Sequence, residues 1–169
     1  MAILTTTYAA DAALAVTAWT TTLAAGETAT SAIFANGSTN YVDVLIGGAL
    51  ALDATTPVAG DTMDIYISGQ YSDTATDMGG AIDALYGAGG EEVVDTSFVR
   101  ANLTLLAVVS VEATTPATAQ TYHWGPVSVA AAFGGVMPKN FMLALHNNTA
   151  GAIAAGCDVN TIGITYTST

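Results

Sequence analysis

The sequence predicts an all-β domain, and three observations point to this class. Short runs rich in β-branched and aromatic residues alternate with small polar residues, clusters of Gly, Pro, Asn and Asp separate the runs, and helical periodicity is nearly absent. About eight strands with closely spaced turn signals favour a two-sheet antiparallel β-sandwich, jelly-roll-like, with a barrel as the alternative. A chain of 169 residues has room for one core, so residues 1–169 are expected to form a single domain.

The first half of the chain contains four expected strand segments. Leu14 to Thr22 places its apolar residues on one face and Thr and Trp on the other. A short piece around Ala32-Ile33-Phe34 leads to Asn36-Gly37, a dipeptide typical of tight turns. Tyr41 to Leu52 is interrupted at Gly47-Gly48, which indicates a bulge or a close backbone approach. Asp61 to Gly69 alternates as a half-buried strand does, and we expect it to pair with this long strand.

The second half contains four more expected strands. Leu103 to Val111 is apolar on both faces, which predicts a central strand covered on both sides. A second long hairpin is expected through Tyr122 to Val129, followed by strands at Asn140 to His146 and Val159 to Tyr166. The sequence Ala-Thr-Thr-Pro occurs at 54–57 and again at 113–116, and both copies are interpreted as hairpin loops. The repeat indicates either two equivalent hairpins or chance in a chain rich in Ala and Thr.

Two segments depart from the strand pattern and are expected to contact other proteins. Residues 72–96 form a long, Gly-punctuated insertion, and connections of this length usually have a function or reach a neighbour. Residues 1–12 are interpreted as an extended N-terminal arm that adds to the sheet edge of a neighbour. The interface residues predicted from these segments and from the aromatic side chains are Tyr8, Met78, Ile82, Leu85, Tyr86 and Trp124.

The charge of the chain excludes some partners and favours others. Only Arg100 and Lys139 are basic and the formal net charge is −12, so the domain repels a nucleic-acid backbone. Only 9% of the residues are charged, so the surface must be built largely from neutral side chains that lose little when another protein covers them. Apolar stretches such as Val44 to Leu52 are too short to cross a bilayer, and no secretion signal is visible.

The residues that carry chemistry do not form a recognisable catalytic or metal-binding motif. His123, His146 and Cys157 are interpreted as structural: His123 as packed or at an interface, His146 as exposed at a strand end, and Cys157 as an inert thiol. The acidic residues lack the dense spacing of a calcium loop, with the pair Glu91-Glu92 as the nearest candidate. We therefore expect no enzymatic activity, no cofactor and no metal.

Carbohydrate binding is the main alternative to a structural role. β-Sandwiches often present aromatic side chains to sugars, and the chain contains Trp19, Trp124 and several Tyr. These aromatic residues are scattered along the sequence. Filling gaps between sheets or anchoring an interface is the other interpretation of the two tryptophans.

The C-terminal segment supplies a resemblance to a known class of proteins. Pro138-Lys139-Asn140-Phe141-Met142-Leu143-Ala144-Leu145-His146-Asn147-Asn148-Thr149-Ala150-Gly151, followed by Asn160-Thr161-Ile162-Gly163-Ile164-Thr165-Tyr166, resembles the closing strand pair of tailed-bacteriophage virion proteins. An Asn-Asn-Thr turn joins two apolar strands there. The resemblance covers about the last fifth of the chain and brings no catalytic residues with it.

This resemblance implies a capsid decoration (cement) protein, a small β-sandwich on the outer capsid that holds capsid subunits together. The implied partners are the chain itself, as a homotrimer, and the major capsid protein. The implied location is the virion surface, after synthesis in the host cytoplasm. Other virion roles stay open: a capsid jelly roll, a tail or collar component, or a fibre base.

Overall fold

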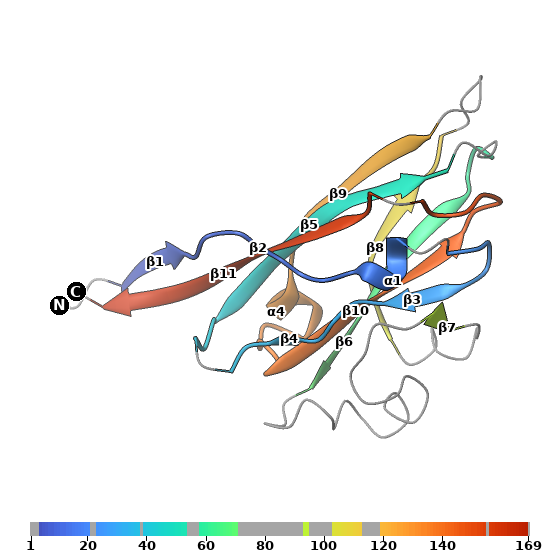
Figure 1. Cartoon of the computed structure of the whole chain (residues 1–169). Coiled ribbons are helices and arrows are strands. Elements are labelled where there is room, and N and C mark those ends of the chain that lie inside the picture. Colours follow the sequence, from blue (N-terminus) through green and yellow to red (C-terminus); the bar gives the residue numbers. More distant parts are fainter. Residues whose placement is uncertain are drawn as a thin grey trace.

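The chain folds into two antiparallel β-sheets packed face to face (Figure 1). The computed structural model describes residues 4–20, 23–37, 39–53, 58–70, 93–94, 103–112, 119–154 and 156–168. Within these residues there are eleven strands and two four-residue helices, α1 (Thr17–Thr20) and α4 (Val129–Ala132). The predicted all-β sandwich is therefore confirmed.

Sheet A and sheet B together contain all eleven strands. Sheet A has the order β1-β11-β5-β9, with β2 beside β11. Its strands are β1 (Leu4–Tyr8), β2 (Ala12–Ala13), β5 (Asp43–Leu52), β9 (Gln120–Ser128) and β11 (Asp158–Ser168). Sheet B has the order β7-β3-β10-β6-β8, with β4 beside β10. Its strands are β3 (Thr28–Thr30), β4 (Phe34–Ala35), β6 (Thr62–Gln70), β7 (Val93–Val94), β8 (Thr104–Ser110) and β10 (Asn140–Asn148).

The order of the strands is jelly-roll-like, as the sequence predicts. Among the described strands, the chain changes sheets between β2 and β3, β4 and β5, β5 and β6, β8 and β9, β9 and β10, and β10 and β11. Strands that are neighbours in a sheet are thus far apart in the sequence, and the eight strands β1, β11, β5, β9 and β3, β10, β6, β8 make two four-stranded layers. This is the arrangement that two interlocked Greek keys produce.

One core fills the space between the sheets, and period-two alternation accounts for it. Val44, Ile46, Leu50 and Leu52 of β5 point inward, opposite a row of fully or almost fully buried residues on sheet B. That row comes from β6 and β10 and consists of Met63, Ile65, Ile67, Phe141, Leu143 and Leu145. The inward face predicted for Asp61 to Gly69 is confirmed.

The predicted strand from Leu14 to Thr22 is wrong. Leu14 and Val16 are buried, but the backbone then turns into α1, with Trp19 N–H donating to the carbonyl of Val16 at 2.9 Å. This turn brings Trp19 into the core, where its side chain is fully buried, instead of leaving it on the opposite face. Burial of one large aromatic side chain outweighs the weak strand alternation of this segment.

The predicted pairing between Tyr41–Leu52 and Asp61–Gly69 is also wrong. β5 pairs with β9 and β11 in sheet A, whereas β6 pairs with β8 and β10 in sheet B. The two Ala-Thr-Thr-Pro segments themselves lie outside the described residues, but the strands on either side of each belong to different sheets. Neither β5 and β6 nor β8 and β9 pair with each other as a hairpin would. Alternation predicts which face of a strand is buried, and it does not identify the neighbouring strand.

The strand covered on both sides is β10 and not the segment Leu103 to Val111. β8 lies at the edge of sheet B, with Leu105 and Val108 exposed. In β10, the unbroken apolar run Phe141 to Leu145 is buried on both faces, as expected for an inner strand. The bulge predicted at Gly47-Gly48 is confirmed, because the register of β5 against β9 shifts between Ile46 and Gly48.

The turn predicted at Asn36-Gly37 is present and is closed by the Asn36 side chain. Asn36 Nδ2 donates to the carbonyl of Tyr41, and Asn36 Oδ1 accepts from the Tyr41 N–H. The turn leads from β4 in sheet B to β5 in sheet A and does not form a hairpin.

Candidate interaction surface

A two-stranded ribbon projects from one end of the sandwich. β1 pairs with the C-terminal half of β11, from Leu4 opposite Ser168 to Tyr8 opposite Ile164. The pairing of β11 with β5 ends at Ile164, so residues 165–168 pair with β1 alone among the described strands. Figure 1 shows this ribbon extending beyond the two sheets. The N-terminal arm predicted from the sequence is thus paired with its own chain.

The two faces of the ribbon differ sharply in composition. Thr5 and Thr7 lie opposite Thr167 and Thr165, so one face consists of threonine alone. The other face carries Leu4, Thr6 and Tyr8 on β1 and Ile164, Tyr166 and Ser168 on β11. Three of its large side chains are exposed, Leu4 by 65%, Tyr8 by 62% and Tyr166 by 54%, and Ile164 is half-buried. Strands that alternate in this way normally bury their apolar face, and none of the described residues covers this one.

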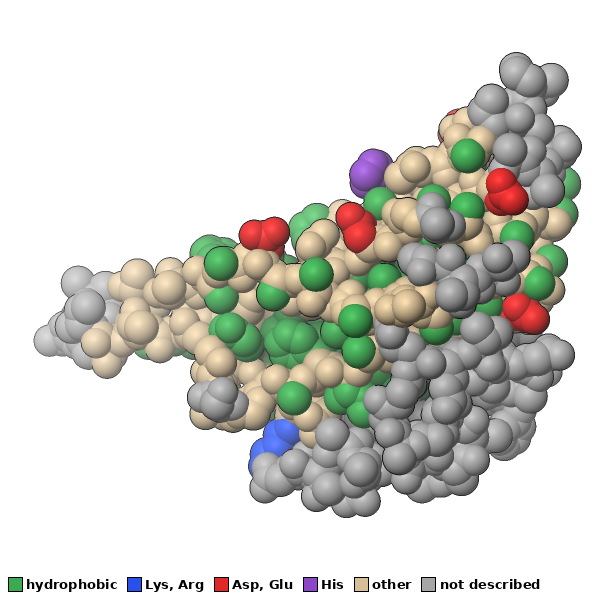
Figure 2. Space-filling model, in the orientation of Figure 1, with side chains coloured by type: hydrophobic (Ala, Val, Ile, Leu, Met, Phe, Trp, Pro, Cys, Tyr) green, Lys and Arg blue, Asp and Glu red, His purple; other side chains and the backbone are tan. Residues whose placement is uncertain are grey.

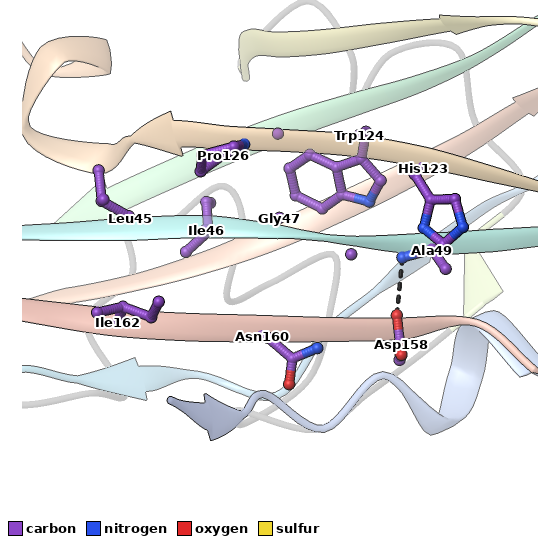
Figure 3. A pocket seen from close by; sticks show the side chains of 12 residues that line it. Leu45, Ile46, Gly47, Ala49, His123, Trp124, Pro126, Asp158, Asn160 and Ile162 are labelled. Atoms are coloured by element: carbon purple, nitrogen blue, oxygen red, sulfur yellow. Dashed lines mark hydrogen bonds between the residues drawn. The ribbon is translucent and has the colours of Figure 1, made fainter. Parts of the chain in front are cut away.

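A shallow depression lies on the outward face of sheet A, on the three adjacent strands β11, β5 and β9 (Figure 3). Its volume is about 360 Å³. It is lined by Leu45, Ile46, Gly47, Gly48, Ala49, His123, Trp124, Gly125, Pro126, Asp158, Asn160 and Ile162. The hollow arises because three glycines, Gly47, Gly48 and Gly125, meet where β9 accommodates the bulge against β5.

The polar residues of the depression do not make a catalytic group. Asp158 Oδ1 accepts the Ala49 N–H at 2.7 Å, as the dashed line in Figure 3 marks. His123 lies opposite Ala49 on the other side of β5, so the Cα atoms of His123 and Asp158 are separated by two strand spacings, roughly 10 Å. The lining contains no Ser, Thr, Cys or Tyr to act as a nucleophile. Its chemistry is suited to holding an apolar group.

The contact between Ser128 and Asp43 is structural. Ser128 Oγ donates to Asp43 Oδ2 at 2.7 Å and accepts from the Ala131 N–H, so Ser128 is the N-cap of α4. Asp43 Oδ1 also accepts the Ala130 N–H. Both side chains are therefore used to fix the start of α4 against β5.

His146 is buried and not exposed as predicted. Its side chain is only 3% exposed, and its Nδ1 lies 3.0 Å from Thr28 Oγ1 of the adjacent β3. The prediction ended the strand at His146, but β10 continues to Asn148 and both of its faces are covered. The neighbouring Asn147 forms the local hydrogen bonds expected for an Asn-Asn-Thr turn.

Cys157 is a buried free thiol that immediately precedes β11. It accepts a hydrogen bond from the Ala51 N–H, with 3.3 Å between N and Sγ. Burial raises the pKa of the Cys157 thiol, and the nearby carboxylate of Asp158 acts in the same direction. Little thiolate is present at neutral pH as a result.

We expect iodoacetamide at pH 8 to alkylate Cys157 at least about tenfold more slowly in the folded protein than in urea. Because the folded thiol has the higher pKa, its contribution to stability is present at neutral pH and lost as the pH rises through that raised value. Mass spectrometry of the alkylated fraction over time measures both rates. Equal rates in the two states would show that the thiol is accessible and ionised.

The structure places some of the other predicted residues and leaves others undescribed. Tyr8 is exposed on the ribbon, whereas Trp124 is only 8% exposed and belongs to the core cluster while bordering the depression. Met78, Ile82, Leu85 and Tyr86 lie outside the described residues, as does most of the insertion 72–96. Trp19 and Trp124 are both buried, so they do not form an exposed aromatic platform for a sugar.

Metal ligands, membrane spans and similarity to other proteins also bear on function. No group of three or more His, Cys, Asp or Glu in the described part of the chain is placed to hold a metal ion. Among the same residues, no helix has the length and apolar character of a membrane span.

Neither a scan of protein-family models nor a search of curated proteins finds a match to this chain.

Proposed function

We propose that the chain is a non-enzymatic structural subunit of a virion, a decoration protein that binds the outer capsid surface and reinforces it. The observation that carries this proposal is the exposed apolar face of the ribbon, in a chain of which only 9% is charged. Such a face is unfavourable in water unless another protein covers it. A protein whose exposed apolar face is covered by a partner protein fits a structural role in an assembly.

The shape of the molecule supports the same role. Jelly-roll sandwiches are common building blocks of viral shells, because closed sheets give a stable body from which edges and loops can contact neighbours. In this chain, the ribbon and the edge strand β8 provide exposed surface outside the core for such contacts. The likeness in fold alone is an analogy, and it carries less weight than the ribbon.

The resemblance in the C-terminal segment supports the choice of a phage capsid. The residues that carry it lie in β10, which includes Asn147 and Asn148, in the bend at residues 149–151 and in β11. β11 provides one strand of the ribbon and one wall of the depression. The segment that resembles virion proteins is therefore also the segment that presents the candidate interaction surface.

The decoration role is tested by binding to capsids. Purified protein should co-sediment with shells of tailed-phage particles from cells that express this gene, and it should raise the temperature at which those shells release DNA. Antibodies against the chain should label intact particles from the same cells. Absence of the protein from purified particles would contradict the proposal, whatever its behaviour in isolation.

A further inference from the structure

We infer that the apolar face of the ribbon of one copy docks into the depression on sheet A of a second copy. The ribbon carries protruding side chains, Leu4, Tyr8 and Tyr166, and the depression is a hollow lined by Leu45, Ile162 and Pro126. The apolar face of the ribbon and the depression are different surfaces of one chain. The inference specifies the self-association within the proposed function and does not require a capsid.

A chain cannot fill its own depression with its own ribbon. Ile162, Ile164 and Tyr166 alternate on the same strand, so their side chains point to the same side of β11. Tyr166 lies about 13 Å along the strand from Ile162, at the extended spacing of about 3.3 Å per residue. Figure 1 shows β11 running without a break between the two regions. A second molecule is needed to bring the two surfaces together.

The charge distribution favours another copy of this chain as that molecule. At a net charge of −12, two copies repel each other unless they meet through neutral surfaces. Neither Leu4–Tyr8 nor residues 164–168 contain a charged residue, and the described part of the ribbon shows only tan and green atoms in Figure 2. The depression has a single acidic residue in its lining, Asp158, whose Oδ1 accepts the Ala49 N–H. The described part of the ribbon offers no charged side chain to which a partner of opposite charge could bind.

The area available favours a closed ring over an isolated dimer. The exposed parts of Leu4, Tyr8 and Tyr166 amount to roughly 350 Å², which is a large patch for the surface of a monomer. A specific interface buries about 800 Å² per partner. Each ribbon–depression contact buries roughly 350 Å² on the ribbon side, which is below that value. In a closed ring every copy makes two such contacts, so ring closure strengthens an association that one contact alone holds weakly. Contacts between unlike surfaces form closed rings when the rotation allows, which includes the trimer expected from the sequence.

The inference is tested with single lysine substitutions in the full chain. Tyr166→Lys alters the ribbon, and Asn160→Lys alters the exposed rim of the depression. Thr167→Lys is the matched control, because it adds the same charge to the opposite, threonine face of the same ribbon. All three sites are exposed, so folding should be retained, as circular dichroism and thermal melts can verify.

We expect wild-type protein and Thr167→Lys to form the same oligomer in sedimentation velocity experiments. Tyr166→Lys and Asn160→Lys should each weaken self-association at least about tenfold. Mixing these two variants should then produce a one-to-one dimer, because one retains an intact depression and the other an intact ribbon. The mixture is the decisive experiment. If the oligomer formed instead by contact of one surface with the same surface of a second copy, mixing the two variants would not restore an intact contact.

Three results would overturn the inference. The first is a wild-type protein that stays monomeric at high concentration. The second is an oligomer that neither substitution weakens. The third is a monomer whose binding to capsid shells is lost on Tyr166→Lys and kept on Thr167→Lys, which would assign the ribbon to the capsid protein and leave the decoration role standing. Conversely, a ribbon-dependent oligomer that never binds shells would uphold the inference and contradict the decoration role.

Discussion

Replacing Gly48 with alanine is expected to destabilise the fold by about 3 kcal/mol. Gly48 lies in β5, between β11 and β9 in sheet A. A Cβ atom at this position would collide with the carbonyl oxygen of Asp158 and come within 3.0 Å of Val159 Cα. Both are backbone atoms of β11 and cannot rotate away as a side chain can. The strands must separate instead, which disturbs the ladder and the adjacent hydrogen bond from Ala49 N–H to Asp158.

Chemical denaturation of Gly48→Ala and Gly37→Ala provides the comparison. Gly37 is exposed and does not require a positive φ, and a Cβ atom added there would meet no heavy atom within 4 Å. Gly37→Ala should therefore change the free energy of unfolding by less than about 0.5 kcal/mol. A Gly48→Ala protein as stable as Gly37→Ala would mean that β5 and β11 are less closely packed than the structure shows.

The position of Gly48 illustrates what the sequence can predict. Two consecutive glycines inside an apolar run have few explanations other than a bulge or a close backbone approach, and the structure contains both. The same reasoning predicts the inward face of β6, because the period of two is a local property of the chain. Fold class, buried faces and interruptions of strands are accessible for this reason.

The pairing of the strands is not accessible in the same way. β5 and β6 are consecutive and both long, which makes a hairpin the simplest expectation, yet each pairs only with strands distant in sequence. Jelly-roll order depends on contacts between residues more than a hundred positions apart, such as β1 with β11. A single sequence contains no local signal for those contacts.

The candidate interaction surface is predictable only in part. Tyr8 and the arm are identified by their apolar and threonine pattern, but the pairing of the arm with residues 164–168 is not. The depression depends on Gly47 and Gly125, which come together through the pairing of β5 with β9. Their spacing of 78 positions in the chain gives no sign of that contact. A depression that forms because glycines on two strands lack side chains leaves no recognisable motif in the sequence.

Replacing Asn147 with alanine is expected to cost about 3 to 5 kcal/mol of stability. Asn147 continues the inward-facing row of β10 and its side chain is fully buried. Its Nδ2 group donates to the carbonyls of Leu23 and Gly151, at 2.9 and 2.7 Å. Its Oδ1 accepts from the N–H and the hydroxyl of Thr149, at 3.1 and 2.7 Å. Alanine would leave these groups buried without this partner, and each unsatisfied group adds its own desolvation cost.

Urea denaturation of Asn147→Ala, Asn147→Asp and Asn148→Ala separates hydrogen bonding from packing. Asn148 is the adjacent residue of the same type, but it is exposed, with a single side-chain contact to Thr62 Oγ1 at 3.3 Å, so its loss should cost less than about 0.5 kcal/mol. Asn147→Asp keeps the size of the side chain and replaces the donating amide by an oxygen that faces two carbonyls. At pH 7 it should therefore be at least as destabilising as alanine, because a buried carboxylate would be added to the lost donors. If Asn147→Asp were as stable as the wild type, the two donated hydrogen bonds would not be what fixes the end of β10 to the segments around Leu23 and Gly151.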